Sequence, residues 1–319
     1  MAHLVETMAY AGQTPWHGLG NALPVNRPLE EWICAAGMDW SIKEAPVRFA
    51  TCANQQIGSL GEASDHKVLY RSDTQTPLSV VGQHYKVVQP REILEFYRDL
   101  TEQSGFEMET AGVLKEGKKL WALARTGQSI DLKGRDTLKG YLLLATACDG
   151  SMATVAQFTS VRVVCHNTLS IATANQSGAV KVPHRSIFNP DAIKQQLGLS
   201  VSGWDAFSDR MKVLSERKLT DREANRYLEQ LFDQGQAGVS AKAKIRNIGT
   251  ILNLYQGNGM GSTLPSAANT AFGLLNAVTQ YVDHEQRARS QDNRLNSAWF
   301  GQGAKFKDRA FEQALQLVA

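Results

Sequence analysis

The sequence lacks the patterns that mark several common classes of protein. Its four cysteines, Cys34, Cys52, Cys148 and Cys165, are widely spaced among 319 residues and never form a CxxC pair. This spacing argues against a disulfide scaffold and against a zinc knuckle, so we expect reduced thiols. No run approaches the about 20 consecutive apolar residues of a membrane span, and residues 1–18 lack the basic head and apolar segment of a secretion signal. We therefore predict a globular protein of the cytoplasm without membrane contact.

Signatures of nucleotide and metal chemistry are also missing. The GNGMG stretch at residues 257–261 lacks the terminal Lys-Ser/Thr of a phosphate loop and follows a predicted helix rather than a strand, so we interpret it as a hinge or contact loop. No two of the seven histidines have the spacing of a helical ligand pair, and the carboxylates form no DxD cluster. These absences favour a protein that is not an enzyme and needs neither a metal nor another cofactor.

Positive charge is concentrated in the middle of the chain. Residues 112–186 contain ten Lys/Arg and four Asp/Glu, so this segment carries +6 although the whole chain carries only +3. Such an uneven distribution is typical of a face that binds a polyanion, and solvated lysines on a strand-rich surface give the same count. Charge alone leaves both interpretations open.

The first third of the chain is predicted to be mostly strands. After an irregular segment over residues 1–30, LEEWICAAG indicates a short helix that ends at Gly37. β-branched and aromatic residues between turn signals then predict strands at residues 39–51, 65–72 and 77–90. Pro90 is expected to begin a helix that ends at Gly105. The order is β-β-β-α.

Two basic hairpins should follow this helix. Glu116–Gly117 and Asp149–Gly150 each lie between apolar runs, in the position of a hairpin turn. Lys118 and Lys119 would then lie at the first hairpin's tip. We predict that residues 1–186 form one strand-rich basic core, with its irregular N-terminal segment.

Beyond this core the pattern changes to helices. Asn189 is placed as the N-cap of a helix with Pro190 at its first position, and Thr220 with Glu223 has the spacing of a capping box. We predict an α+β fold: an antiparallel sheet of basic hairpins backed by a helix, and a mainly helical region at residues 187–319. That region is expected to pack on the core or to mediate assembly.

The stretch TSVRVVCHNTLSIATA, residues 159–174, fits both a helix and a strand. Either period puts Arg162 and His166 on one face and Cys165 off it, so Cys165 and its neighbour His166 cannot activate each other. A buried apolar role for Cys165 is favoured over a nucleophile. Arg162, His166 and Asn167 form either a phosphate clamp or a polar face that hydrogen-bonds to neighbouring loops.

Basic and aromatic residues occur together in and near the basic segment, as in proteins that hold phosphates and stack bases of single strands. VKVPHRSIFNP, residues 180–190, is one such stretch. Trp16 and His17 lie on a turn that acts as a lid or as a stacking element. The predicted nucleic-acid-binding residues are Lys118, Lys119, Trp121, Arg125, Lys133, Arg135, Lys139, Arg162, His166, Asn167, Lys181, His184 and Arg185.

Several stretches resemble a family of phage and plasmid-like proteins that is known only as a domain of unknown function. The stretches are TPWHGLG at 14–20, HYKVVQP at 84–90, DGS at 149–151, VRVVCHNTL at 161–169 and YVDHEQRAR at 281–289. The likeness covers nearly the whole chain, and VRVVCHNTL is its most specific part. It implies a role in the DNA metabolism of mobile elements, and it brings no catalytic residues with it.

The strand and helix order, the basic hairpins and the mobile-element setting are together similar to single-strand annealing recombination proteins. That similarity implies a curved antiparallel sheet backed by a helix, assembly of identical chains into a ring or filament, and a basic groove that holds the phosphate backbone. We therefore predict a non-enzymatic single-stranded DNA-binding protein that promotes annealing, with phage or host recombination proteins as further partners. The alternative is a hydrolase or nuclease that uses Cys165 or a histidine.

Overall fold

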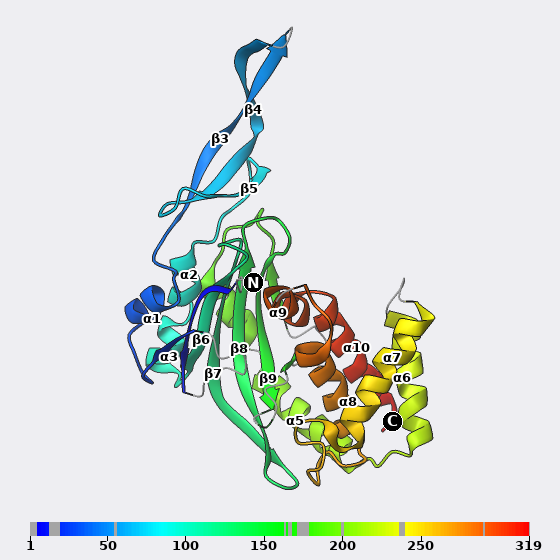
Figure 1. Cartoon of the computed structure of the whole chain (residues 1–319). Helices are drawn as coiled ribbons and strands as arrows, with labels where there is room; N and C mark the ends of the chain where they lie inside the picture. The colour runs from blue at the N-terminus through cyan, green and yellow to red at the C-terminus, as the bar shows by residue number, and fades with distance from the viewer. Residues whose placement is uncertain are drawn as a thin grey trace. The chain divides into compact units, whose positions relative to one another are not determined.

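The computed structural model describes residues 5–12, 20–53, 56–162, 164, 168–170, 179–198, 201–235, 240–289 and 291–318. The strands are β1 (Val5–Ala11), β2 (Asn21–Leu23), β3 (Ile42–Ala53), β4 (Gln56–Arg71), β5 (Pro77–Gly82), β6 (Glu107–Leu114), β7 (Lys119–Leu132), β8 (Asp136–Ala147), β9 (Thr154–Arg162), β10 (Thr168–Ser170) and β11 (Ala179–Val182). The helices are α1 (Leu29–Ala35), α2 (Pro90–Glu95), α3 (Arg98–Gln103), α4 (Pro190–Gly198), α5 (Val201–Glu216), α6 (Asp221–Gly235), α7 (Ala241–Asn253), α8 (Ala271–Gln280), α9 (Gln291–Phe300) and α10 (Gln302–Gln316), with π-helical turns η1 (Leu254–Asn258) and η2 (Tyr281–Glu285). Figure 1 shows their course along the chain.

The chain divides into two compact units. Unit 1 consists of Met1–Arg125, Leu142–Ala156 and Ala179–Leu197, and unit 2 consists of Thr126–Tyr141, Gln157–Gly178 and Gly198–Ala319. Because the segments of the two units alternate along the chain, one cut in the sequence does not separate them. Along the sequence, strands give way to helices after residue 186, as predicted. The two compact units are instead defined by contacts between residues, and their boundaries lie at other positions.

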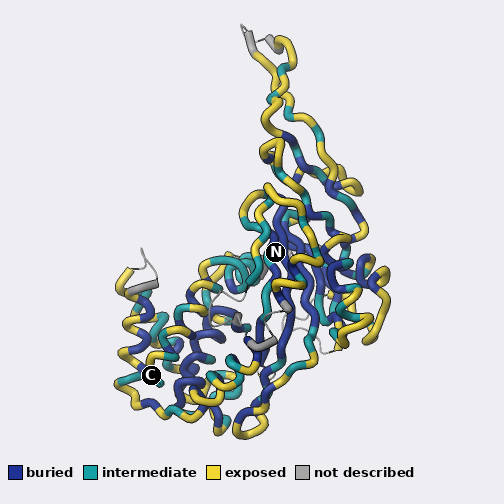
Figure 2. The backbone as a smooth tube through the Cα atoms, turned by 180° about the vertical axis from the view of Figure 1, so that it is seen from behind, coloured by how far each residue is buried: buried dark blue, intermediate teal, exposed yellow. Residues whose placement is uncertain are grey.

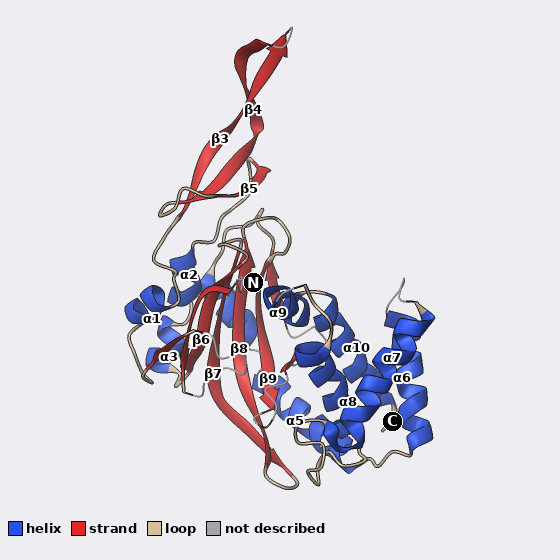
Figure 3. Ribbon diagram, viewed as in Figure 1, coloured by secondary structure: helices blue, strands red, loops and turns tan. Residues whose placement is uncertain are grey.

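The fold class is α+β, as predicted, with most strands in the first part of the chain and helices after residue 190 (Figure 3). The large sheet has the order β10-β9-β8-β7-β6-β1-β2, and β11 pairs with β9. It is mixed rather than wholly antiparallel, because β2 runs parallel to β1. The first predicted hairpin is confirmed: β6 and β7 pair antiparallel, and Lys115, Glu116 and Gly117 between them have positive φ angles.

The helix expected between Pro90 and Gly105 is divided into α2 and α3. Phe96 and Tyr97, fully buried, lie at the break. The Tyr97 hydroxyl lies 2.8 Å from the carbonyl oxygen of Ala122 in β7 and 3.0 Å from that of Leu142 in β8. The two short helices therefore pack against these strands through Tyr97, which agrees with a sheet backed by a helix.

A second sheet is formed by β3, β4 and β5 in that order. The strand predicted over residues 77–90 ends at Gly82, and the rest of that stretch is irregular. The reason lies with Gln89, whose side chain accepts a hydrogen bond from the Ile42 amide (2.8 Å) while its own amide donates to Glu92 Oε2 (2.6 Å) in a capping box. Gln89 thus begins α2 instead of extending β5.

Unit 2 has its own hydrophobic core, built from α5, α6, α8 and α10 and from the part of the sheet that belongs to this unit. Phe207, Met211 and Leu228 are fully buried in it. The predicted capping box of α6 is present, because the Thr220 amide donates to Glu223 Oε2 at 2.8 Å. Among the described helices, none has both the length and the apolar composition required to cross a bilayer.

Candidate nucleic-acid interface

The predicted binding residues are distributed over both units. Unit 1 contains Lys118, Lys119, Trp121, Arg125, Lys181, His184 and Arg185, and unit 2 contains Lys133, Arg135, Lys139 and Arg162. His166 and Asn167 lie outside the described residues, as do Cys165, Trp16 and His17.

Two of the predicted contacts in β7 are not at the surface. The side chains of Lys119 and Trp121 are buried, with 5% and 3% of their residue surfaces exposed. β7 lies between β6 and β8, and its first six residues are all buried, as expected for a central strand that is covered on both faces. Lys119 and Trp121 are thus part of the core rather than available to a ligand, and the prediction of surface contacts was wrong for both.

Two other cations are already paired with carboxylates. Arg125 lies opposite Glu107 on β6, and its guanidinium is 2.7 Å from Glu107 Oε2 and 3.1 Å from Glu109 Oε2. Lys133 Nζ lies 3.6 Å from Glu216 Oε1, with both side chains exposed. The paired Arg125 carries little free positive charge toward a phosphate, whereas the exposed Lys133 pair is weak and screened.

Arg162 is the largest departure from the predicted interface. It lies at the end of β9, 2% exposed, and its Nε is 2.8 Å from Asp136 Oδ1 while its Nη2 is 2.5 Å from Asp136 Oδ2. The guanidinium also donates to the carbonyl oxygens of Met260 (3.3 Å) and Gly261 (3.0 Å), and the Ser266 hydroxyl donates to Asp136 Oδ2 (2.6 Å). An arginine with these partners is buried and paired, so it does not form the exposed face that the sequence suggested.

The glycine-rich loop has a structural use in this network. Gly261 has φ +67°, and a Cβ at this position would lie 3.0 Å from Arg162 Nη2. Only glycine lets the backbone approach the guanidinium so closely in this conformation. The interpretation of residues 257–261 as a contact loop therefore agrees with the structure, and the contact is with Arg162.

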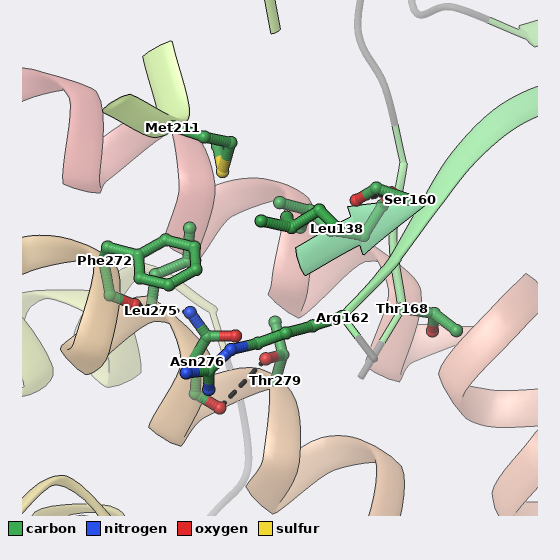
Figure 4. A pocket seen from close by; sticks show the side chains of 10 residues that line it. Leu138, Ser160, Arg162, Thr168, Met211, Phe272, Leu275, Asn276 and Thr279 are labelled. Atoms are coloured by element: carbon green, nitrogen blue, oxygen red, sulfur yellow. Dashed lines mark hydrogen bonds between the residues drawn. The ribbon is translucent and has the colours of Figure 1, made fainter. Parts of the chain in front are cut away.

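A small cavity of about 20 Å³ borders Arg162 in unit 2. In Figure 4 the Arg162 side chain extends toward Asn276 and Thr279 of α8, with Phe272 on the same helix. A volume of this size holds about one water molecule, whereas a bound small molecule needs about 300 Å³ or more. The described residues around Arg162 therefore form no pocket for a small molecule.

Unit 1 brings together two aromatic residues that lie far apart in the sequence. The rings of Tyr85 and His184 are stacked, with centroids 4.3 Å apart and planes inclined by 15°. His184 Nδ1 lies 2.9 Å from the Lys86 carbonyl oxygen and its Nε2 lies 3.2 Å from that of Met152, so the imidazole is held on both sides. The Tyr85 hydroxyl donates to the Ala147 carbonyl oxygen at 2.7 Å. We call Tyr85 and His184 the ring stack.

Three cations adjoin the ring stack along the chain, and a fourth is linked to it through Ala147 and Cys148. Lys86 adjoins Tyr85, Arg185 adjoins His184, and Lys181 lies three residues before His184; all three are exposed. Lys118 is half-buried, and its carbonyl oxygen accepts from the Cys148 amide (2.9 Å), next to the residue that Tyr85 contacts. Within the described part of the chain none of the four cations has an ion-pair partner. We call these four residues the basic rim.

Burial and nearby negative charge keep two groups beside the ring stack protonated. Burial raises the pKa of the Tyr85 hydroxyl, and the neighbouring Cys148 and Asp149 act in the same direction. Burial likewise raises the pKa of the Cys148 thiol to about 12, with Asp149 as the second cause. A thiol with such a pKa is a poor nucleophile at neutral pH, so Cys148 is unsuited to catalysis.

A cleft of about 400 Å³ in unit 1 is lined by residues that include Arg27, Glu30 and Arg98. Its two arginines are paired with acids: Arg98 Nη2 lies 2.8 Å from Glu30 Oε1, and Arg27 Nη1 lies 3.5 Å from Glu31 Oε1. The hydrogen bond from Arg98 lowers the pKa of Glu30, so this carboxylate stays charged. The lining holds three acids, Glu30, Glu102 and Glu107, against two arginines, so the cleft is less suited to a polyanion than the basic rim.

Sequence reasoning identified Lys118, Lys181, His184 and Arg185 but missed Tyr85 and Lys86. The signal was present in HYK at residues 84–86, which interleaves aromatic and basic residues. Those residues were expected to belong to a strand, where neighbouring side chains point to opposite faces. Their irregular backbone instead brings Tyr85 beside His184.

The fold and these contacts define an α+β protein with a stacked pair of rings and unpaired cations in the described part of one unit and a buried ionic network in the other. Comparison with protein families gives a match over residues 77–299 to a domain of unknown function, DUF932. The match covers more than half of the chain, so the protein belongs to this family. Neither the curated proteins nor the solved structures include a match.

Proposed function

We propose that the protein binds single-stranded DNA through the ring stack and the basic rim of unit 1. The observation that carries this proposal is the stacked pair Tyr85–His184 among four cations that have no ion-pair partner in the described part of the chain. Proteins that bind single strands without sequence preference combine an aromatic platform for the bases with cations for the backbone. Both parts are present here: Lys86 follows Tyr85 directly, and Lys181 and Arg185 lie within three residues of His184.

The two parts of the site make separable contributions. A base that stacks on an aromatic side chain gains about 1–3 kcal/mol, and this gain depends little on the sequence of the strand. Each cation that neutralises a phosphate releases counterions, which makes the affinity depend on salt. Lys181 and Arg185 are exposed, so they reach a phosphate backbone without leaving a buried position.

We further propose that this binding serves strand annealing in the recombination of mobile-element DNA, alongside phage or host recombination proteins. The support is the resemblance of the sequence to phage and plasmid-like proteins and to annealing proteins. Annealing requires only that the backbone is held while the bases stay accessible. It requires no bond cleavage.

The binding test uses the full chain and a labelled oligothymidine, with fluorescence anisotropy measured over a range of salt concentrations. The double variant Lys181→Ala/Arg185→Ala should reduce the slope of log affinity against log salt by about 1.4 in magnitude, about 0.7 for each lost phosphate contact. The matched control is Lys242→Ala/Lys305→Ala, because both lysines are exposed and lie in unit 2. The control should keep the parent slope.

The stacking test compares two substitutions of one residue. Tyr85→Phe keeps the ring and loses the hydroxyl, whereas Tyr85→Leu loses the ring. Tyr85→Leu should weaken binding by about tenfold and Tyr85→Phe by much less, because stacking uses the ring face. Equal effects of the two substitutions, or a double variant that behaves like the lysine control, would show that the strand binds elsewhere.

The same protein is then incubated with complementary labelled strands, with and without magnesium. Faster formation of intact duplex supports annealing. Shortened product supports the hydrolase or nuclease alternative instead. No retarded strand at low salt would contradict the proposal as a whole.

A further inference from the structure

The outer part of the β3–β4 hairpin is a two-stranded ribbon without a third strand. We define the distal ribbon as residues 47–51 of β3 and 58–63 of β4, in which Arg48 lies opposite Glu62, Phe49 opposite Gly61 and Ala50 opposite Leu60. β5 pairs with β4 only from His66 onward, and β3 is an edge strand. Among the described strands, none pairs with either edge of the distal ribbon, which thus has two free edges.

An isolated two-stranded ribbon is marginally stable in water, because it has no buried apolar face. The distal ribbon nevertheless carries large apolar side chains at its surface: Leu60 is 71% exposed and Phe49 is 52% exposed. Figure 2 shows this end of the hairpin mainly in the colour of exposed residues. Exposed apolar side chains on a free-edged ribbon are typical of a protein contact.

The two faces of the distal ribbon differ. On one face, Phe49 covers its cross-strand neighbour, because a Cβ on Gly61 would lie 2.5 Å from Phe49 Cζ. On that face the ring of Phe49 therefore covers the backbone at Gly61. The opposite face carries Leu60 beside the small side chain of Ala50, with the pair Arg48–Glu62 next to them at 3.6 Å. We call this opposite face the Leu60 face.

We propose that the Leu60 face is a self-association surface on which the ribbon of a second copy of this chain lies. A two-fold axis parallel to the strands would put β3 of one copy over β4 of the other. Leu60 would then lie over Ala50 of the partner, a large side chain over a small one, and Arg48 would meet the partner's Glu62. Both contacts occur twice, so the Leu60 face is complementary to itself in size and in charge.

The charge of the distal ribbon argues against a nucleic acid as the occupant. Its ionisable side chains are Arg48 and Glu62, which leave it without net charge. A polyanion is bound by an excess of cations, as in the basic rim, whereas a balanced pair suits a protein surface. The patch is small, so the dimer should be weak and should dissociate on dilution.

Sedimentation velocity over a concentration series tests the proposal in the full chain. The parent should show a reversible increase in mass toward a dimer. Arg48→Glu and Glu62→Arg should each abolish this increase, because each brings two like charges together across the two-fold axis. An equimolar mixture of the two variants should restore the dimer, since every contact between unlike copies is then Glu with Arg.

The mixture distinguishes a contact between chains from damage within one chain, because neither variant can repair the other's fold. Leu60→Ser should also lower the dimer affinity, by more than tenfold, while its control Ile245→Ser, a 72% exposed residue in unit 2, should not. A parent that stays monomeric at every concentration overturns the proposal, and so does a mixture that stays monomeric. Oligothymidine binding by the monomeric variants is measured in parallel, so this result stands apart from that of the DNA-binding site.

Discussion

Replacing Arg162 tests whether this residue is structural or a phosphate contact. Arg162→Met keeps an apolar stem and removes every donor of the guanidinium. Asp136, which is 0% exposed, then retains only the 2.6 Å hydrogen bond from Ser266 among its contacts in this network. Removing one partner of a buried ion pair costs about 3–5 kcal/mol, because the other charge stays buried without compensation. We expect a loss of this size in the free energy of unfolding.

The measurement is urea denaturation followed by circular dichroism, on the parent, Arg162→Met, Asp136→Leu and the double variant. Since apolar replacement of both partners removes the uncompensated charge, the double variant should lose at least about 2 kcal/mol less than the sum of the single losses. The carbonyl oxygens of Met260 and Gly261 lose their donor in Arg162→Met, so the double variant should remain below the parent.

A small effect on stability together with a changed salt dependence would refute the structural role of Arg162. If Arg162→Met changes the unfolding free energy by less than about 1 kcal/mol and instead reduces the salt dependence of oligothymidine binding, Arg162 contacts phosphate and the buried pair is not the native arrangement. At temperatures where the variant is folded, we expect its salt slope to equal that of the parent. Loss of stability with an unchanged slope supports the structural role.

Two further predictions concern single titratable groups in unit 1. Arg71 holds the pKa of Asp73 at about 2, below its ordinary 3.8, through Nη2–Oδ2 and Nε–Oδ1 contacts of 2.7 and 3.0 Å. The pair therefore stabilises the fold above pH 3.8 and loses this effect as the pH falls toward 2. Asp73→Asn should lower the free energy of unfolding by about 1 kcal/mol at pH 6, a value reduced because the carboxylate is partly exposed. In denaturation curves the difference from the parent should vanish near pH 2. An equal difference at both pH values would contradict the pairing. Burial raises the pKa of Cys148 to about 12, so iodoacetamide should alkylate Cys148 at pH 8 more than about 100-fold more slowly than the exposed Cys34. The two rates are read from peptide masses. Comparable rates would show that Cys148 is not buried.

Local parts of the fold could be predicted because the interactions behind them join residues close in sequence. The Asn189 cap is present, with Asn189 Oδ1 accepting from the Ala192 amide at 3.1 Å, and so is the box of Thr220 and Glu223. The turn at residues 115–118 is also where the sequence predicted it. Each involves a backbone preference or a hydrogen bond over three or four residues, which a sequence pattern displays directly.

The candidate site was predictable only in part. Lys181, His184 and Arg185 were identified because basic and aromatic residues occur together in one short stretch. Tyr85 was missed because its partner His184 comes from a distant part of the chain, and no local period connects the two. The pattern therefore identified some of the cations of the candidate site, but not the partner of His184 in the ring stack.

By itself, the sequence determined the α+β class, the caps and turns, and a positive segment between residues 112 and 186. Only the tertiary structure decided which of those cations face solvent. Arg162 is neutralised by Asp136, 26 positions away, and hydrogen-bonded to carbonyl oxygens 98 and 99 positions away, whereas Lys181 and Arg185 stay exposed. The physical reason is that the free energy of a charged side chain depends on its burial and on the partners that the folded chain brings to it. Neither quantity is a property of the residue or of its neighbours in sequence.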